Sequence, residues 1–164
     1  MRVYLPATLP LLRDWLEAGA ATTSAGAYAV TPDVREWYRD GDLEELEHVA
    51  QVAAAQAALD LLADDPTAPR RRAVLAVDVA DDAARPAPDH GRAAVTIAGP
   101  VERTRWASAL VDDEAAALVV TAAVERLSAA AAGDPDAQFA LDEAAAHDLG
   151  WYAVQELSDL LSAG

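Results

Sequence analysis

Residues 72–113 read RAVLAVDVADDAARPAPDHGRAAVTIAGPVERTRWASALVDD, and three of the five expected strands lie in this segment. It contains three apolar runs of strand length, at 72–80, 93–99 and 105–113. The segment 81–92 between the first two runs is a polar, proline-rich loop. Because the connections are short, we expect the three strands to follow one another in an antiparallel meander.

The elements around this stretch are placed by hydrophobic periodicity and by capping residues. Thr8, Thr31 and Asp42 are expected to cap helices, and Asp42 with Glu45 three residues on resembles a capping box. Strands are expected at 2–7 and 27–31, helices at 9–18, from Pro32 to the break at 39–42, at 43–63, 114–133 and 144–161, and an irregular segment or brief strand at 134–143. Strands cluster and then helices cluster, which is typical of an α+β protein. We expect one mixed, largely antiparallel sheet of about five strands with helices packed on it, in a single globular domain over residues 1–164.

The composition is strongly acidic, with a formal net charge of −16. Such a field repels phosphate backbones, so we expect no nucleic-acid partner. The one basic cluster, PRRRA at 69–73, is interpreted as a loop-to-strand junction with solvated arginine ends. All twelve basic residues are arginine and there is no cysteine, which excludes lysine Schiff bases, thiolate nucleophiles and cysteine metal sites.

The sequence also predicts where the protein works. The N-terminal apolar run is broken by Pro6, Pro10, Arg13 and Asp14, so it does not read as a secretory signal. No stretch approaches the roughly 18–20 uncharged apolar residues of a membrane span. The lack of cysteine fits a reducing compartment. We expect a cytoplasmic protein with no membrane partner and no cofactor.

A Glu-x-x-His spacing at Glu45 and His48 raises the question of a metal site, because helical di-metal carboxylate proteins use this spacing. Those sites need two such helices and two further glutamates, and this chain offers one. Glu45 and His48 also fall on the outward side of the predicted helix. We therefore expect a solvated charged face and no metal.

The same helix, 43–63, is apolar on two sides. One stripe is predicted to face the core and consists of Leu43, Leu46, Ala50, Ala53, Ala54, Ala57 and Leu61. Val52, Ala55 and Leu59 lie on the side of His48. The helix is therefore either sandwiched within the chain or covered by a partner. We expect a homo-oligomer or a protein partner through helix 43–63.

Candidate ligand-binding residues come from three segments. Asp112 and Asp113 end a predicted strand and start a helix, so they either cap that helix or bind Mg²⁺. In HDLGWYAVQEL, 147–157, aromatic and polar groups mix, which suits either a docking anchor for the core or a small polar pocket. The candidate pocket residues are Trp37, Arg39, Asp112, Asp113, His147, Trp151, Tyr152, Gln155 and Glu156. No nucleophile elbow or phosphate loop is present, and catalytic residues are unknown.

Three segments, RVYLPATLPLL at 2–12, AVTPDVREWYRDGDLEELE at 29–47 and LGWYAVQEL at 149–157, together resemble a family of short actinobacterial proteins of unknown function. The resemblance runs over the whole chain and implies a bacterial cytosolic protein, but it supplies no catalytic residues. The leading hypothesis is a non-catalytic protein-interaction or self-associating module. The alternative is a small-molecule- or metal-dependent enzyme with an acidic and aromatic pocket.

Overall fold

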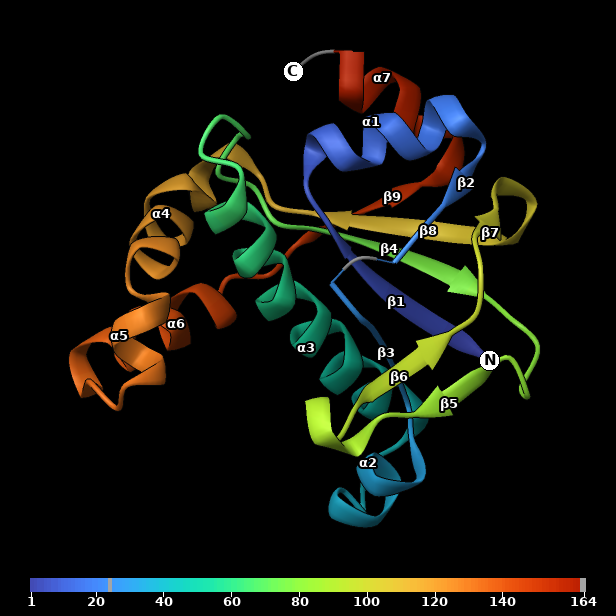
Figure 1. The fold of residues 1–164 in the computed structure, drawn as a ribbon, viewed down its shortest axis with the longest axis horizontal. Helices are drawn as coiled ribbons and strands as arrows, with labels where there is room; N and C mark the ends of the chain where they lie inside the picture. Colours follow the sequence, from blue (N-terminus) through green and yellow to red (C-terminus); the bar gives the residue numbers. More distant parts are fainter. Residues whose placement is uncertain (24, 163–164) are drawn as a thin grey trace.

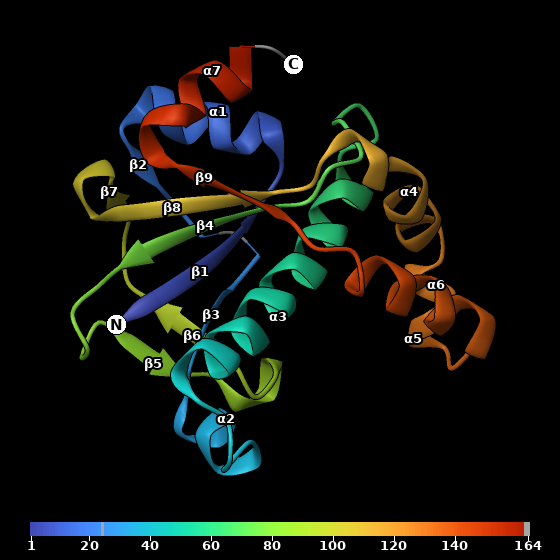
Figure 2. The ribbon, with the colours of Figure 1, turned by 180° about the vertical axis from the view of Figure 1, so that it is seen from behind.

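The computed structural model describes residues 1–23 and 25–162. A twisted antiparallel sheet runs through the centre of the molecule, with helices on both faces (Figure 1). Helices α1 (Leu9–Ala18) and α7 (Leu157–Ser162) cover one face, and α3 (Leu43–Asp64) crosses the other. Figures 1 and 2 show the remaining C-terminal helices grouped beyond α3. The α+β class predicted from the sequence is confirmed.

The main sheet has seven strands in the order β5-β6-β3-β1-β4-β8-β9. The strands are β1 (Arg2–Ala7), β3 (Ala27–Ala29), β4 (Ala73–Asp78), β5 (Ala84–Pro86), β6 (Ala94–Ile97), β8 (Trp106–Val111) and β9 (Gly150–Ala153). The short strands β2 (Ala20–Ala21) and β7 (Val101–Glu102) form a separate pair. The main sheet therefore has more strands than the five predicted. Each neighbouring pair in it is antiparallel, so the sheet is not mixed.

The predicted meander of three consecutive strands is wrong. β4 pairs directly with β8, from Ala73 opposite Val111 to Val77 opposite Trp106. β6 lies on the other side of the sheet, between β3 and β5. The reason is that β1 occupies one edge of β4 along its whole length, and the six-residue β8 takes the other edge. β5, which lies inside the predicted loop, forms a hairpin with β6 instead.

The predicted helix starts are confirmed where capping chemistry defines them. The hydroxyls of Thr8 and Thr31 accept hydrogen bonds from the backbone three residues on, at the starts of α1 and α2 (Pro32–Trp37). Asp42 and Glu45 form the predicted capping box at the start of α3. The Glu45 side chain therefore caps the start of α3.

The C-terminal third differs most from the prediction. The expected helix 114–133 is divided at Arg126 into α4 (Ala117–Glu125) and α5 (Leu127–Ala131), after a short 3₁₀ turn, η3 (Glu114–Ala116). Segment 134–143, expected to be irregular or a brief strand, is instead helical: Asp134 caps α6 (Pro135–Ala145), which contains the rest of the segment. The expected helix 144–161 instead contains the end of α6, a connecting segment, strand β9, the 3₁₀ turn η4 (Val154–Glu156) and α7. Pairing of β9 with β8 outweighs the helical pattern, and it explains Gly150, a poor helix residue that starts a strand here.

Both apolar sides of α3 are used within the chain. Leu46, Ala50 and Ala54 are buried against the sheet. Leu59 and Leu62 are buried against α4 and α6. The helix is thus sandwiched over its second half, one of the two arrangements that its sequence allowed. Within residues 1–23 and 25–162, no helix has the length and apolar character needed to cross a membrane.

Candidate functional site

A groove of about 360 Å³ lies between α3 and the chain that leaves α6. Its volume is within the range of about 300–1,000 Å³ that is usual for small-molecule sites. One wall is made by α3 and the other by the end of α6 and residues 147–149, with contributions from the start of β4 and from β8. The lining residues are His48, Gln51, Val52, Ala55, Gln56, Leu59, Arg72, Leu110, Leu141, Ala145, His147, Asp148 and Leu149.

α3 packs on one face of the sheet and contacts β1, β3 and β4. The groove lies beside α3 on the side of β8, where Leu110 is part of its lining. Leu110 on β8 is paired with Val74 on one side and with Trp151 on the other, so these three side chains share the α3 face. Leu110 is half-buried at the groove, and Trp151 is 65% exposed at the sheet edge.

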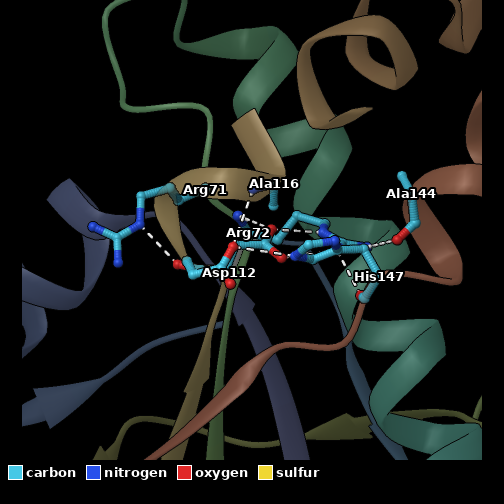
Figure 3. A network of polar contacts seen from close by, with 7 residues as sticks. Arg71, Arg72, Asp112, Ala116, Ala144 and His147 are labelled. Atoms are coloured by element: carbon cyan, nitrogen blue, oxygen red, sulfur yellow. Dashed lines mark hydrogen bonds and ion pairs between the residues drawn. The ribbon is translucent and has the colours of Figure 1, made fainter. Parts of the chain in front are cut away.

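Arg72, which lines the groove, forms a buried ion pair with Asp112. Figure 3 shows the polar contacts of this pair. The Arg72 side chain is 2% exposed and that of Asp112 is 0% exposed. Arg72 Nε and Nη2 donate to the two carboxylate oxygens of Asp112 at 2.8 and 2.9 Å, and the Arg72 backbone N–H donates to Asp112 Oδ2 at 2.8 Å. This bidentate geometry satisfies the carboxylate and neutralises the guanidinium charge.

Arg72 also fixes the second wall of the groove. Its Nη1 donates to the carbonyl oxygen of Ala144 at 2.8 Å, and its Nη2 donates to that of His147 at 3.1 Å. Ala144 lies in the last turn of α6, where helix carbonyls lack partners within the helix, and His147 follows the helix by two residues. The buried arginine therefore ties segment 144–147 to the sheet.

The basic cluster PRRRA is a loop-to-strand junction, as predicted, but Arg70 and Arg71 are half-buried and hydrogen-bonded to backbone carbonyls instead of being solvated ends. Arg70 donates to the carbonyl oxygens of Leu62 and Ala68 at the end of α3. Arg71 Nε donates to the carbonyl oxygen of Asp112 at 2.8 Å. Arg70 thus binds carbonyl groups at the end of α3, and Arg71 connects the chain before β4 to the chain after β8.

Three of the predicted pocket residues lie together. Asp112 turns into the core and binds Arg72, while its neighbour Asp113 caps η3 by accepting from the Ala116 N–H at 3.1 Å. His147 lines the groove, and its Nε2 lies 3.2 Å from Asp113 Oδ1. The two aspartates point to different partners, so they do not form the shared Mg²⁺ site that was one interpretation of this motif.

The predicted residues after His147 lie on β9 and η4, beside the groove or away from it. Trp151 stands at the sheet edge next to Leu110. Tyr152 is on the opposite face, against the core under α1 and α7. Gln155 is exposed, and Glu156 accepts a hydrogen bond from the Ala153 N–H at 2.6 Å, which protects an edge-strand amide.

Trp37 and Arg39 belong to a different part of the molecule, around α2. Trp37 is 62% exposed, and the Arg92 guanidinium lies 3.6 Å from its ring centroid. Arg92 also pairs with Asp33 at 3.0 Å beside a shallow hollow. Arg39 is exposed. The structure does not bring these residues to the groove.

Sequence reasoning missed the α3 wall and Arg72. His48 was assigned to a solvated face, yet it lines the groove with Gln51, Val52 and Gln56. The available signal was the apolar side chains on the side of His48, which marked that side as more than a solvent face. Within the part of the chain that the structure describes, no three His, Cys, Asp or Glu side chains are grouped as a metal site.

Tyr4 on β1 is hydrogen-bonded to α3, the helix that forms one wall of the groove. Its hydroxyl donates to Glu47 Oε2 at 2.8 Å and accepts from Gln51 Nε2 at 3.4 Å. Burial, reinforced by the hydrogen bond to Glu47 and the charge of that carboxylate, raises the pKa of Tyr4 to about 12, although the bond from Gln51 acts in the opposite direction. The tyrosine thus remains a neutral donor in the folded protein.

This pKa predicts how stability depends on pH. The Tyr4 phenol ionises near 10.0 when unfolded and near 12 when folded, so between these values the folded state binds more protons. Its contribution to stability is complete below pH 10 and is lost as the pH rises toward 12. Urea unfolding across this window should show a steeper loss of stability in the wild type than in Tyr4→Phe. Equal slopes would contradict the assignment.

The chain belongs to a family of unknown function (DUF6912), because the sequence pattern of that family matches residues 1–161. Comparison with curated proteins and with solved structures finds no match. The resemblance to a family of unknown function is therefore confirmed over nearly the whole chain. The family description names no activity, so function has to be inferred from the groove.

Proposed function

We propose that this protein is a non-catalytic binding module and that the groove beside α3 is its binding site. The observation that carries the proposal is the composition of the lining. Alkyl side chains from α3 and α6 alternate with the hydrogen-bonding groups of His48, Gln51, Gln56 and His147. A mostly apolar cleft with a few polar groups is the usual form of a site that binds by burial and is oriented by hydrogen bonds.

The groove also limits how a partner can reach helix 43–63. The second half of α3 is covered by α4 and α6, and its inner side by the sheet. Besides the exposed Leu43 at its first turn, α3 offers a protein partner or a second copy the apolar side chain of the half-buried Val52, which lines the groove. The proposal therefore concentrates the predicted partner surface on the stretch from His48 to Leu59.

Filling the groove should weaken binding. A library of small fragments is screened against the wild type by ligand-observed NMR, and each hit is tested against Val52→Trp. The indole is expected to occupy the groove, so binding should weaken at least tenfold. Ala63→Trp is the matched control, because Ala63 is exposed on the same helix and does not line the groove.

Self-association is tested with the same pair of variants by sedimentation velocity. A dimer of the wild type that is lost in Val52→Trp and kept in Ala63→Trp would identify the second copy as the occupant. Hits that bind all three proteins equally would contradict the groove as the binding site.

A second candidate function, an acid–base enzyme, is favoured by one observation: His147 at the groove is held by the Asp113 carboxylate. A carboxylate that orients an imidazole is a common arrangement for a general base. Incubating each fragment hit with the protein and following it by proton NMR separates the two functions. Turnover that disappears in His147→Gln would establish the enzyme, whereas a binding module leaves the hits unchanged.

We also propose that the protein does not bind nucleic acid and works in the cytoplasm. The first is supported by the net charge of −16 and by the internal hydrogen bonds of Arg70, Arg71 and Arg72. The second is supported by the cysteine-free composition.

A further inference from the structure

We propose that the groove takes a small uncharged molecule with an apolar body and a carbonyl-type oxygen, and that this oxygen accepts a hydrogen bond from Arg72. The inference rests on the proposed function and names the chemical class of the ligand. Its basis is the hydrogen-bond count of a buried arginine that lines the cavity.

A guanidinium has five N–H donors. In Arg72, Nε donates once to Asp112, Nη2 donates to Asp112 and His147, and Nη1 donates to Ala144. One proton of Nη1 therefore has no acceptor among the residues that the structure describes. Because a buried donor without a partner is costly, a ligand oxygen that reaches it gains affinity.

The charge balance selects a neutral acceptor. Asp112 already compensates Arg72 at 2.8 Å, so a carboxylate or phosphate at the same place would be an excess negative charge beside a buried carboxylate. The acidic surface of the chain adds to this repulsion. A cationic head group at this place would be repelled by the positive charge of the Arg72 guanidinium.

The remaining lining specifies the body of the ligand. Val52, Ala55, Leu59, Leu110 and Leu141 offer apolar contact along the groove. A volume of about 360 Å³ is at the lower end of small-molecule sites, which fits a compact ring system. A ligand of this class would lie against the alkyl side chains with its oxygen directed to Arg72.

The test compares amides with the carboxylates of the same carbon skeleton. The probes are benzamide, phenylacetamide and indole-3-acetamide, then benzoate, phenylacetate and indole-3-acetate, with toluene as a body that lacks an acceptor. Each is titrated at neutral pH into wild-type protein labelled on arginine nitrogens and on valine and leucine methyl groups. Using the wild-type chain avoids substitutions of Arg72, which would disturb the fold.

We expect the amides to bind about tenfold more tightly than toluene, which lacks the hydrogen bond to a charged group, and about tenfold more tightly than their carboxylates, which add a negative charge beside Asp112. The amides should also shift the side-chain N–H resonances of Arg72 together with the methyl resonances of Val52 and Leu59. Val52→Trp should remove binding of every probe.

Carboxylates that bind as tightly as the amides would overturn the inference. Probes that shift the Val52 and Leu59 methyls but not Arg72 would also overturn it, while leaving the groove as a binding site. If no probe binds, the ligand class is wrong, and the fragment screen with Val52→Trp decides separately whether the groove binds anything.

Discussion

Asp112→Ala is expected to lower the free energy of unfolding by about 3–5 kcal/mol, because it leaves the Arg72 guanidinium buried without its counter-charge. Three hydrogen bonds to the carboxylate are lost at once, one of them from the Arg72 backbone. For a chain of this size the loss corresponds to a fall in Tm on the order of 10 °C. Urea unfolding of the two proteins measures it.

Two variants control this experiment. Asp113→Ala removes an exposed helix cap next to Asp112 and should cost only about 1 kcal/mol. The double variant Arg72→Met, Asp112→Leu removes both charges and should recover a large part of the loss, since apolar replacements of a buried pair are often neutral. A cost for Asp112→Ala no larger than that for Asp113→Ala would show that the pair is not buried as described.

Leu62→Ala is expected to lower the free energy of unfolding by about 2–5 kcal/mol. Leu62 is 0% exposed and lies where α3 packs on the helical cluster that contains Val120, Leu141 and Ala144. Truncation leaves a cavity between α3 and these helices. The exposed Leu43 on the same helix is the matched control, and Leu43→Ala should cost much less.

The same variant tests the proposal that residues 1–164 form one domain. The four tryptophans, at positions 15, 37, 106 and 151, lie outside α4, α5 and α6, so their fluorescence follows the sheet and its neighbouring helices. Far-ultraviolet circular dichroism includes the helical cluster. In one cooperative domain, Leu62→Ala shifts both signals to the same lower urea concentration. A shift confined to circular dichroism would indicate a separately unfolding helical unit.

Features that depend on residues close together in the chain could be predicted from the sequence. Thr8, Thr31 and Asp42 were identified as caps because a helix start is defined by a side chain and a backbone N–H only a few residues apart. The bounds of α3 followed from the same reasoning and from its apolar periodicity. Long-range pairing was not predictable in this way, and the order of β4, β6 and β8 was wrong for that reason.

Strand β9 shows the same limit within a single segment. Its sequence fits a helix, with Trp151 and His147 one turn apart, and only the free edge of β8 makes it a strand. The site was predicted in part for a related reason. Asp112, Asp113 and His147 were recognised by residue type, whereas Arg72 depends on a carboxylate forty positions away in the chain and gave no local signal.

The groove between α3 and residues 147–149 is the binding site that we propose. The most direct measurement is a nitrogen–proton NMR titration of the assigned protein with the strongest fragment hit. We expect the largest shifts at His48, Val52, His147 and Leu149, which line the groove from both walls. Largest shifts around Trp37 and Arg92, or along the outer edge of β9, with the groove unchanged, would contradict it.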